Sequence, residues 1–164
     1  MKNWKNLTLG DFEESYYGTI FYAKVELGGQ QVSIGVPNAS FINPRNVKFC
    51  KEALAGWVEN QDLLISMTEK KIKRLISGRN AKPESLLLWA FNFSEPGGNP
   101  PPPAEVLGQP DTVTFIYKPK GDYPETSDGI SDFHLGNDIE LRCYVTNYII
   151  DWDNPDISIS NDFA

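Results

Sequence analysis

The sequence has one histidine, two cysteines and no run of 18 consecutive apolar residues among its 164 residues. A single histidine excludes a multi-histidine metal site, and any catalytic arrangement that needs a histidine would depend on His134. Two cysteines cannot build a disulfide framework, and Cys50 and Cys143 each lie within an apolar pattern, so we expect buried thiols. The polar N-terminal segment leads into no apolar stretch of signal-peptide length. We therefore expect a soluble, cytoplasmic protein.

Positive charge is also scarce, and its distribution is uneven. The chain has a net charge of −7 and a pI near 4.7, which opposes general binding of nucleic acid, a polyanion that proteins hold largely through Lys and Arg. Residues 44–79 carry eight Lys/Arg against four Asp/Glu, whereas residues 104–164 carry three against twelve. An acidic surface of this kind attracts a basic protein partner.

Alternation of apolar and polar residues predicts most of the strands. Adjacent glycines at Gly28-Gly29 supply the positive φ that a tight hairpin turn requires. The apolar run 86–91 belongs to the core, but periodicity alone does not separate a strand from a helical turn there. The alternating segments are 7–12, 19–27, 31–36, 112–118 and 139–145.

Helical spacing of apolar residues occurs between these strand segments. Asn43-Pro44 predicts a helix start, with Asn as N-cap and Pro at the first helical position. We expect a break around residues 60–62 and a second helix that ends before Gly78. The sequence thus predicts a single α+β domain, an antiparallel sheet with a pair of helices packed on one face. Within residues 1–164 we expect a proline-rich connector at 95–110 and a loosely held C-terminal tail from about residue 154.

Acidic residues gather in two segments of the C-terminal half. Neither segment has the ligand ladder of an EF-hand, so calcium binding is the weaker interpretation. Paired carboxylates could also serve a glycosidase, which would need one raised pKa and a fixed separation. Aromatic residues lie among these acids, and this composition is typical of protein interfaces, although acids that only confer solubility would give the same pattern. The acids are Asp122, Glu125, Asp128, Asp132, Asp151, Asp153 and Asp156, and the aromatics are Tyr123, Tyr144, Tyr148 and Trp152.

The basic residues have a simpler explanation. Lys70, Lys73 and Arg74 fall on one face near the expected end of the second helix, where cations offset the helix dipole. A solvated helix face accounts for them without a ligand. Whether the segment 62–79 takes part in binding is left open by the sequence.

The order of the elements resembles that of small bacterial domains grouped with immunity proteins of polymorphic-toxin and contact-dependent growth inhibition systems. The segments that carry this resemblance are Leu9-Gly10-Asp11-Phe12, the hairpin Tyr17 to Val36, Ala53-Leu54, Leu64-Ile65, Val113-Thr114-Phe115 and Leu135-Gly136-Asn137-Asp138-Ile139.

The resemblance implies a cytoplasmic, non-enzymatic protein that binds one cognate toxin domain and blocks its active site or substrate entry, without cofactor or metal. A nuclease toxin with a basic cleft would suit an acidic surface. The residues expected to bind the partner are Asp122, Tyr123, Glu125, Asp128, Asp132, Asp151, Trp152, Asp153 and Asp156. Two alternatives remain open: a carboxylate-based hydrolase in the loop 121–137, with or without a divalent ion, and a structural or adaptor domain.

Overall fold

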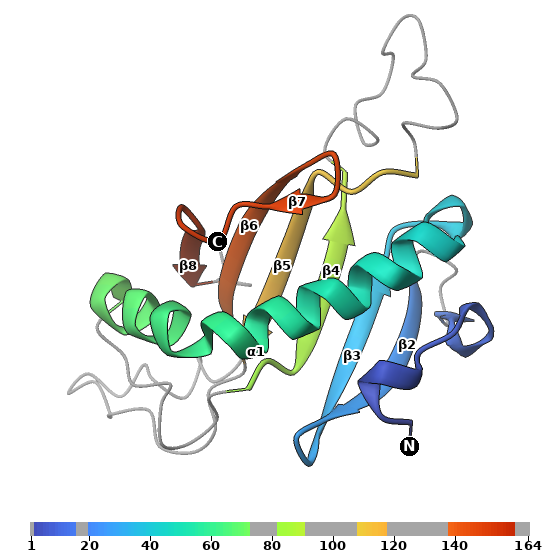
Figure 1. Cartoon of the computed structure of the whole chain (residues 1–164), viewed down its shortest axis with the longest axis horizontal. Helices are drawn as coiled ribbons and strands as arrows, with labels where there is room; N and C mark the ends of the chain where they lie inside the picture. The colour runs from blue at the N-terminus through green and yellow to red at the C-terminus, as the bar shows by residue number, and fades with distance from the viewer. Residues whose placement is uncertain (1, 16–19, 73–81, 91–107, 118–137, 160–164) are drawn as a thin grey trace, which may run out of the picture.

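The computed structural model describes residues 2–15, 20–72, 82–90, 108–117 and 138–159. One long helix, α1 (Pro44–Ile72), crosses one face of an eight-stranded sheet (Figure 1). The sheet order is β1-β2-β3-β4-β5-β6, and both β7 and β8 pair with the remaining side of β6. The strands are β1 (Glu13–Glu14), β2 (Phe21–Leu27), β3 (Gln30–Val36), β4 (Ser85–Trp89), β5 (Thr112–Tyr117), β6 (Ile139–Thr146), β7 (Ile149–Ile150) and β8 (Asp156–Ile159).

The expected α+β class is confirmed, but the sheet is mixed rather than wholly antiparallel. Every neighbouring pair is antiparallel except β3 and β4, which run parallel with Ile34 opposite Leu86. The chain between them includes α1, and a helical crossover of this kind returns the chain to the end from which β3 started. The two predicted hairpin pairings, β2 with β3 and β5 with β6, are both present. Gly28 and Gly29 take φ values of 57° and 85° at the first of these turns.

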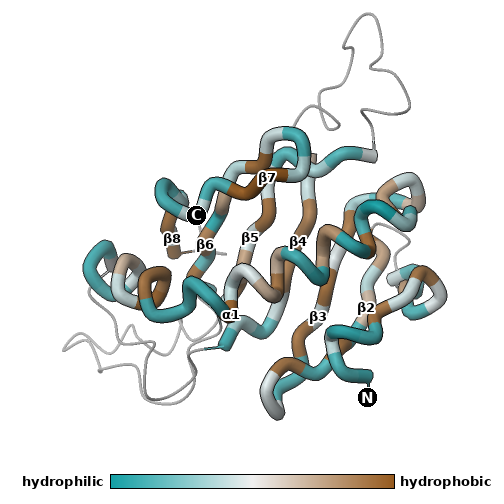
Figure 2. Tube along the Cα trace, viewed as in Figure 1, coloured by the Kyte–Doolittle hydropathy of each residue, from teal (hydrophilic) through white to brown (hydrophobic). Residues whose placement is uncertain are grey.

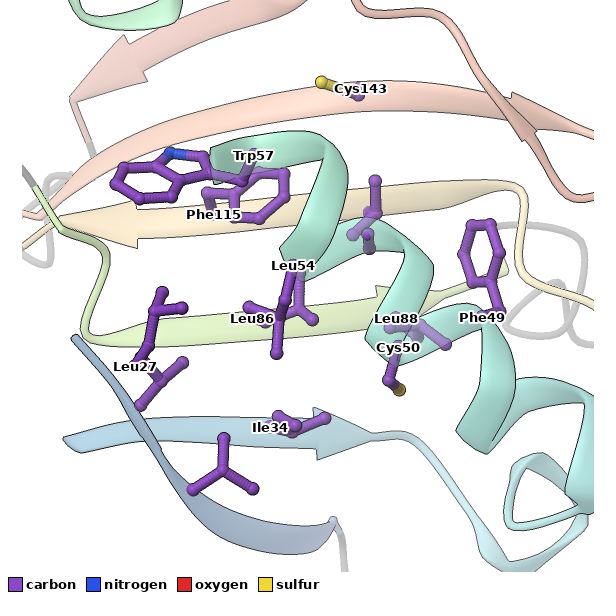
Figure 3. Packing of buried hydrophobic residues seen from close by; sticks show 14 of the residues in the cluster. Leu27, Ile34, Phe49, Cys50, Leu54, Trp57, Leu86, Leu88, Phe115 and Cys143 are labelled. Atoms are coloured by element: carbon purple, nitrogen blue, oxygen red, sulfur yellow. The ribbon is translucent and has the colours of Figure 1, made fainter. Parts of the chain in front are cut away.

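The core lies between α1 and the sheet. Every second residue of β4 and of β6 is buried, and Figure 2 shows hydrophobic stretches on the strands that α1 crosses. Figure 3 shows Cys50, Leu54 and Trp57 of α1 above Leu86 of β4 and Phe115 of β5, and all five residues are buried. Burying this apolar surface stabilises the domain, since each large side chain removed from water contributes roughly 1.5–3 kcal/mol.

Helix α1 is continuous, and the predicted break around residues 60–62 is wrong. The helix starts as expected, because the Asn43 side chain accepts a hydrogen bond of 2.9 Å from the backbone N–H of Asn46. The amide group of Asn60 donates to the carbonyl of Gly56 at 2.8 Å, so this polar residue is satisfied within the helix. Neither Gly nor Pro occurs at 60–62 to interrupt the backbone. One long helix therefore replaces the predicted pair, and its predicted end near Gly78 lies outside the described residues.

The predicted first strand at 7–12 is also wrong. A 3₁₀ turn, η2 (Leu9–Asp11), occupies this region and follows a first such turn, η1 (Trp4–Asn6). The carboxylate of Asp11 accepts hydrogen bonds from the backbone N–H and the hydroxyl of Thr8 at 2.8 and 3.0 Å, which closes the second turn. Lys2 adds an ion pair to Asp11 at 3.1 Å. Local side-chain capping thus outweighs the near-alternating pattern.

The structure differs from the sequence-based expectation at two further places. Asp156–Ile159 form β8, whereas the sequence predicted a loosely held tail from about residue 154. The end of the predicted exposed connector is partly buried, since the Asn46 amide donates a hydrogen bond of 2.6 Å to the carbonyl of Gly108. Residues 95–107 lie outside the described part of the chain. A third 3₁₀ turn, η3 (Ala39–Phe41), precedes α1.

Candidate partner-binding surface

The edge of the sheet formed by β7 and β8 is interrupted. Val145 of β6 pairs with Ile150 of β7, and Arg142 of β6 pairs with Asp156 of β8. The five residues 151–155 therefore lie opposite only two residues of β6, Cys143 and Tyr144, and five residues cannot all pair with two. The excess leaves the sheet as a loop, in the manner of an enlarged bulge.

Trp152 fixes this loop to the body of the domain. Its indole is half-buried and lies 5.8 Å from the ring of Phe115, with the ring planes at 32°. On the helix side it contacts Gly56 so closely that a Cβ atom at this glycine would lie 2.3 Å from Cζ2 of the indole. A residue with a side chain does not fit there. Gly56 therefore allows the indole to enter between α1 and β5, which explains a glycine in the middle of a helix.

The loop is further ordered by Asp151. The Asp151 carboxylate accepts a hydrogen bond of 3.1 Å from the backbone N–H of Asp153 and one of 3.3 Å from the amide of Asn154. This is the geometry of an Asx turn, in which a side chain replaces a backbone acceptor. Asp151 and Asp153 are both exposed. The loop therefore presents its carboxylates to solvent from a defined backbone.

Asp156 follows at the start of β8. Its carboxylate accepts a hydrogen bond from the hydroxyl of Tyr144 on the neighbouring strand, and both side chains are exposed. This hydrogen bond raises the pKa of Tyr144, because an anionic acceptor favours the protonated phenol. Together Asp151, Asp153 and Asp156 form what we call the acidic edge.

Arg142 of β6 lies opposite Asp156 in the strand register and interacts with Tyr144, so one cation stands beside the acidic edge. Elsewhere in the described ranges, Lys2 pairs with Asp11 at 3.1 Å and Lys48 with Glu52 at 3.9 Å. Neither involves an acid of the edge. Three exposed carboxylates outnumber this one neighbouring cation, which gives this end of the sheet a negative potential.

Tyr148, in contrast, is packed inward. It occupies the turn between β6 and β7, where Asn147 and Tyr148 have φ values of 50° and 64°. Its ring makes an edge contact with Phe49 at 5.4 Å, and the guanidinium of Arg45 lies 4.2 Å from the ring centroid. The half-buried position raises the pKa of the Tyr148 hydroxyl. The tyrosine joins the start of α1 to the sheet and is not a free interface residue.

The structure brings four of the predicted partner-binding residues together and gives one of them an internal role. Asp151, Asp153 and Asp156 lie along the same edge, while Trp152 is directed into the domain. The other predicted residues, Asp122, Tyr123, Glu125, Asp128 and Asp132, lie outside the described residues.

The sequence analysis missed Ile149, which follows the tight turn at the tip of the β6–β7 hairpin. Its side chain is 72% exposed, the largest exposure among the large hydrophobic residues of the described ranges. Strand β7 has only two residues, and a strand this short shows no alternation of apolar and polar residues by which the sequence could reveal it.

The thiols match the expectation of core cysteines. Cys50 and Cys143 are both free and buried. Burial raises the pKa of each thiol to about 12, so neither forms a nucleophilic thiolate near neutral pH. Among the residues that the structure describes, no group of three or more His, Cys, Asp and Glu side chains could hold a metal ion. His134 and the acidic loop 121–137 are not among them.

Comparison of the chain with protein-family models, curated proteins and solved structures finds no match. The described residues contain no helix long and apolar enough to cross a membrane. The functional argument therefore rests on the surface of this chain alone.

Proposed function

We propose that this chain is a non-enzymatic binding protein whose partner is a basic protein, and that it acts as an immunity protein that neutralises a bacterial toxin domain. The observation that carries the proposal is the acidic edge, whose three carboxylates are exposed on one short segment that an Asx turn and Trp152 hold in place. A toxin that acts on nucleic acid presents a basic cleft for phosphates, and a rigid set of carboxylates can occupy such a cleft in place of the substrate.

The way the edge is held supports this proposal. Trp152 and the Asx turn at Asp151 fix the loop before any partner arrives. A surface that is already ordered loses little conformational entropy on binding, so more of the interaction energy appears as affinity. The net charge of −7 adds long-range attraction toward a basic partner.

The first experiment identifies the partner. The tagged full-length chain is incubated with a lysate of the source cells at low salt, and bound protein is eluted with a salt step. We expect one basic protein in stoichiometric amount. Its gene is then expressed with and without this chain, and growth that depends on the chain is the result that establishes neutralisation. A captured protein that is harmless when expressed alone would contradict the immunity function.

A pair of variants then tests the acidic edge. Changing Asp153 and Asp156 to Lys is expected to slow association with the partner by about tenfold or more at ~0.01 M ionic strength, where the Debye length is roughly 30 Å. The matched control changes Glu59 and Asp62 to Lys, two exposed acids on α1, which alters the net charge equally. Equal association rates for the two variants would show that the acidic edge is not the contact surface. Thermal unfolding of each variant verifies that the fold is retained.

A further inference from the structure

The two edges of the sheet differ in how many of their backbone N–H and C=O groups already form hydrogen bonds within the described residues. At the first edge, β1 pairs with one end of β2, and the backbone N–H of Glu26 in β2 donates to the carbonyl of Lys2 at 2.7 Å. Asn3 also forms a bridge with Glu26. The N-terminal residues thus cover this edge along most of its length.

The direction of the backbone groups at the other edge follows from two hydrogen bonds of β6. The carbonyl of Tyr144 accepts from the N–H of Asp151 at 2.9 Å, whereas the N–H of Val145 donates to Asp111, beside β5, at 2.8 Å. Even-numbered residues of β6 therefore direct their backbone groups toward β7 and β8. In the antiparallel register, Asp156 and Ser158 occupy the hydrogen-bonded pairs with β6.

The intervening residues of β8 consequently point their backbone groups out of the sheet. These residues are Ile157 and Ile159, and the same reasoning applies to Ile150 of β7, because Ile149 pairs with Thr146. No backbone hydrogen bond to these outward groups is formed by any residue in the described ranges. An extended segment placed beside β8 would find donors and acceptors at the spacing of a strand.

The side chains along this edge determine which strand fits. Asp156 and Ser158 lie on the sheet face away from α1, while Ile157 and Ile159 lie on the helix side and are half-buried. Residues directly opposite one another on neighbouring strands share a face. A fitting strand therefore places Lys or Arg beside Asp156 and a branched apolar residue beside Ile157.

A second copy of this chain fits poorly at the same edge. It would bring a second set of the three carboxylates, Asp151, Asp153 and Asp156, close to the first set. Like charges on adjacent strands repel. The edge thus disfavours self-association and favours a cationic strand, which combines attraction to one partner with rejection of another.

We propose that the β7–β8 edge binds its partner by strand addition, and that the added strand alternates Lys or Arg with branched apolar residues. This inference rests on the proposed function, because it specifies how the acidic edge engages a basic protein. We expect the added strand to form its backbone hydrogen bonds with β8 alone, because the loop 151–155 separates β8 from β7.

The test uses synthetic peptides and the full-length chain. The probe is a short peptide of alternating Lys and Val that carries a fluorophore, with the Glu and Val analogue as control. Two further versions are N-methylated, one on the Val amides and one on the Lys amides, and both keep the same charge. We expect one methylated peptide to bind as the unmodified probe does and the other to bind at least about tenfold more weakly, because only one set of amides faces β8.

Amide exchange provides the second readout. Binding of the unmodified probe should slow exchange at Ile157 and Ile159 without slowing it at Asp156 and Ser158, whose amides already bond to β6. Equal binding by both methylated peptides would overturn strand addition and leave charge-driven binding by the acidic edge intact. No binding of the unmodified probe at low salt, or a dimer of the free chain that closes the edge, would also overturn the inference.

Discussion

Gly56→Ala is the substitution that tests the packing of Trp152 most directly. In an exposed position of a helix, replacing Gly by Ala stabilises a protein by roughly 0.5–1 kcal/mol, because alanine loses less backbone entropy on folding. Here the added Cβ would lie 2.3 Å from Cζ2 of the indole and 3.0 Å from Cε2. The indole is a rigid ring with Phe115 beside it, so the clash is not relieved by rotating a flexible chain.

Overpacking of this kind costs about 1–3 kcal/mol. We therefore expect Gly56→Ala to lower the free energy of unfolding by about 1–2 kcal/mol, although helix propensity alone predicts an increase. Trp152→Ala removes the indole with which the new Cβ clashes. By itself it should lower the free energy of unfolding by on the order of 2 kcal/mol, since the ring is half-buried. In the Trp152→Ala background the effect of Gly56→Ala should change sign and become stabilising by roughly 0.5–1 kcal/mol.

Urea unfolding of the wild type, the two single variants and the double variant measures this cycle. The midpoints and slopes give the four free energies of unfolding, and the coupling energy expected between the two positions is about 2 kcal/mol. If Gly56→Ala stabilises the chain equally with and without the indole, Trp152 does not pack against the helix. The loop 151–155 would then lack the rigidity on which the proposed function depends.

Two further substitutions or conditions test the interior. The folded chain holds the protons of Cys50 and Cys143 up to about pH 12, whereas the unfolded chain releases them near pH 9. The free energy of unfolding should therefore fall as the pH rises through this interval, which thermal unfolding measures. The fall should be smaller when both cysteines are changed to Ala. Asn46→Ala removes the amide that donates to the carbonyls of Phe41 and Gly108 at 2.9 and 2.6 Å. The Phe41 carbonyl keeps the N–H of Asn43 at 3.1 Å, whereas the Gly108 carbonyl loses this donor, so the free energy of unfolding measured in urea should fall by about 1–3 kcal/mol. A loss below about 0.5 kcal/mol would show that water replaces the amide.

The elements predicted well from sequence are those with a local, periodic cause. The β2–β3 hairpin follows from alternation on both sides of Gly28-Gly29, and the start of α1 follows from the Asn43-Pro44 pair. The strand pairing of β5 with β6 was also predictable from alternation. The parallel pairing of β3 with β4 was not, because it depends on the length and path of α1 rather than on any residue in the strands.

The two wrong predictions, the helix break at 60–62 and the strand at 7–12, arose where side-chain contacts outweigh the local sequence pattern. Asn60 and Asp62 have low helix propensity, but the Asn60 side chain bonds back to the helix and packing of α1 on the sheet outweighs the local preference. At Leu7–Phe12 the alternating pattern is real, yet the contact between Thr8 and Asp11 favours a turn. In both places a few side-chain hydrogen bonds decide between conformations of similar intrinsic free energy.

The candidate surface was predictable in composition and not in arrangement. The acids of the segment 151–156 are visible in the sequence, and the structure places them on one edge. The inward direction of Trp152 was not visible, because it depends on Gly56, a residue remote in sequence whose lack of a side chain acquires meaning only when the helix and the loop are in contact. A glycine inside an otherwise regular helical pattern was the one available signal.

The same three acids explain how this protein can keep a sheet edge that none of its described residues pairs with. Edge strands with unpaired backbone groups tend to associate, and proteins limit this tendency with short strands, bulges and charges. All three devices occur together here: β8 is short, the loop 151–155 interrupts the edge, and Asp151, Asp153 and Asp156 make it acidic. The carboxylates protect the edge only against acidic strands, however, because they repel an acidic neighbour and attract a basic one. If Asp153 and Asp156 were changed to Asn, the edge would lose both properties, and we expect weaker binding of a cationic strand together with greater self-association in sedimentation experiments. Loss of binding without any gain in self-association would show that the acids serve the partner alone.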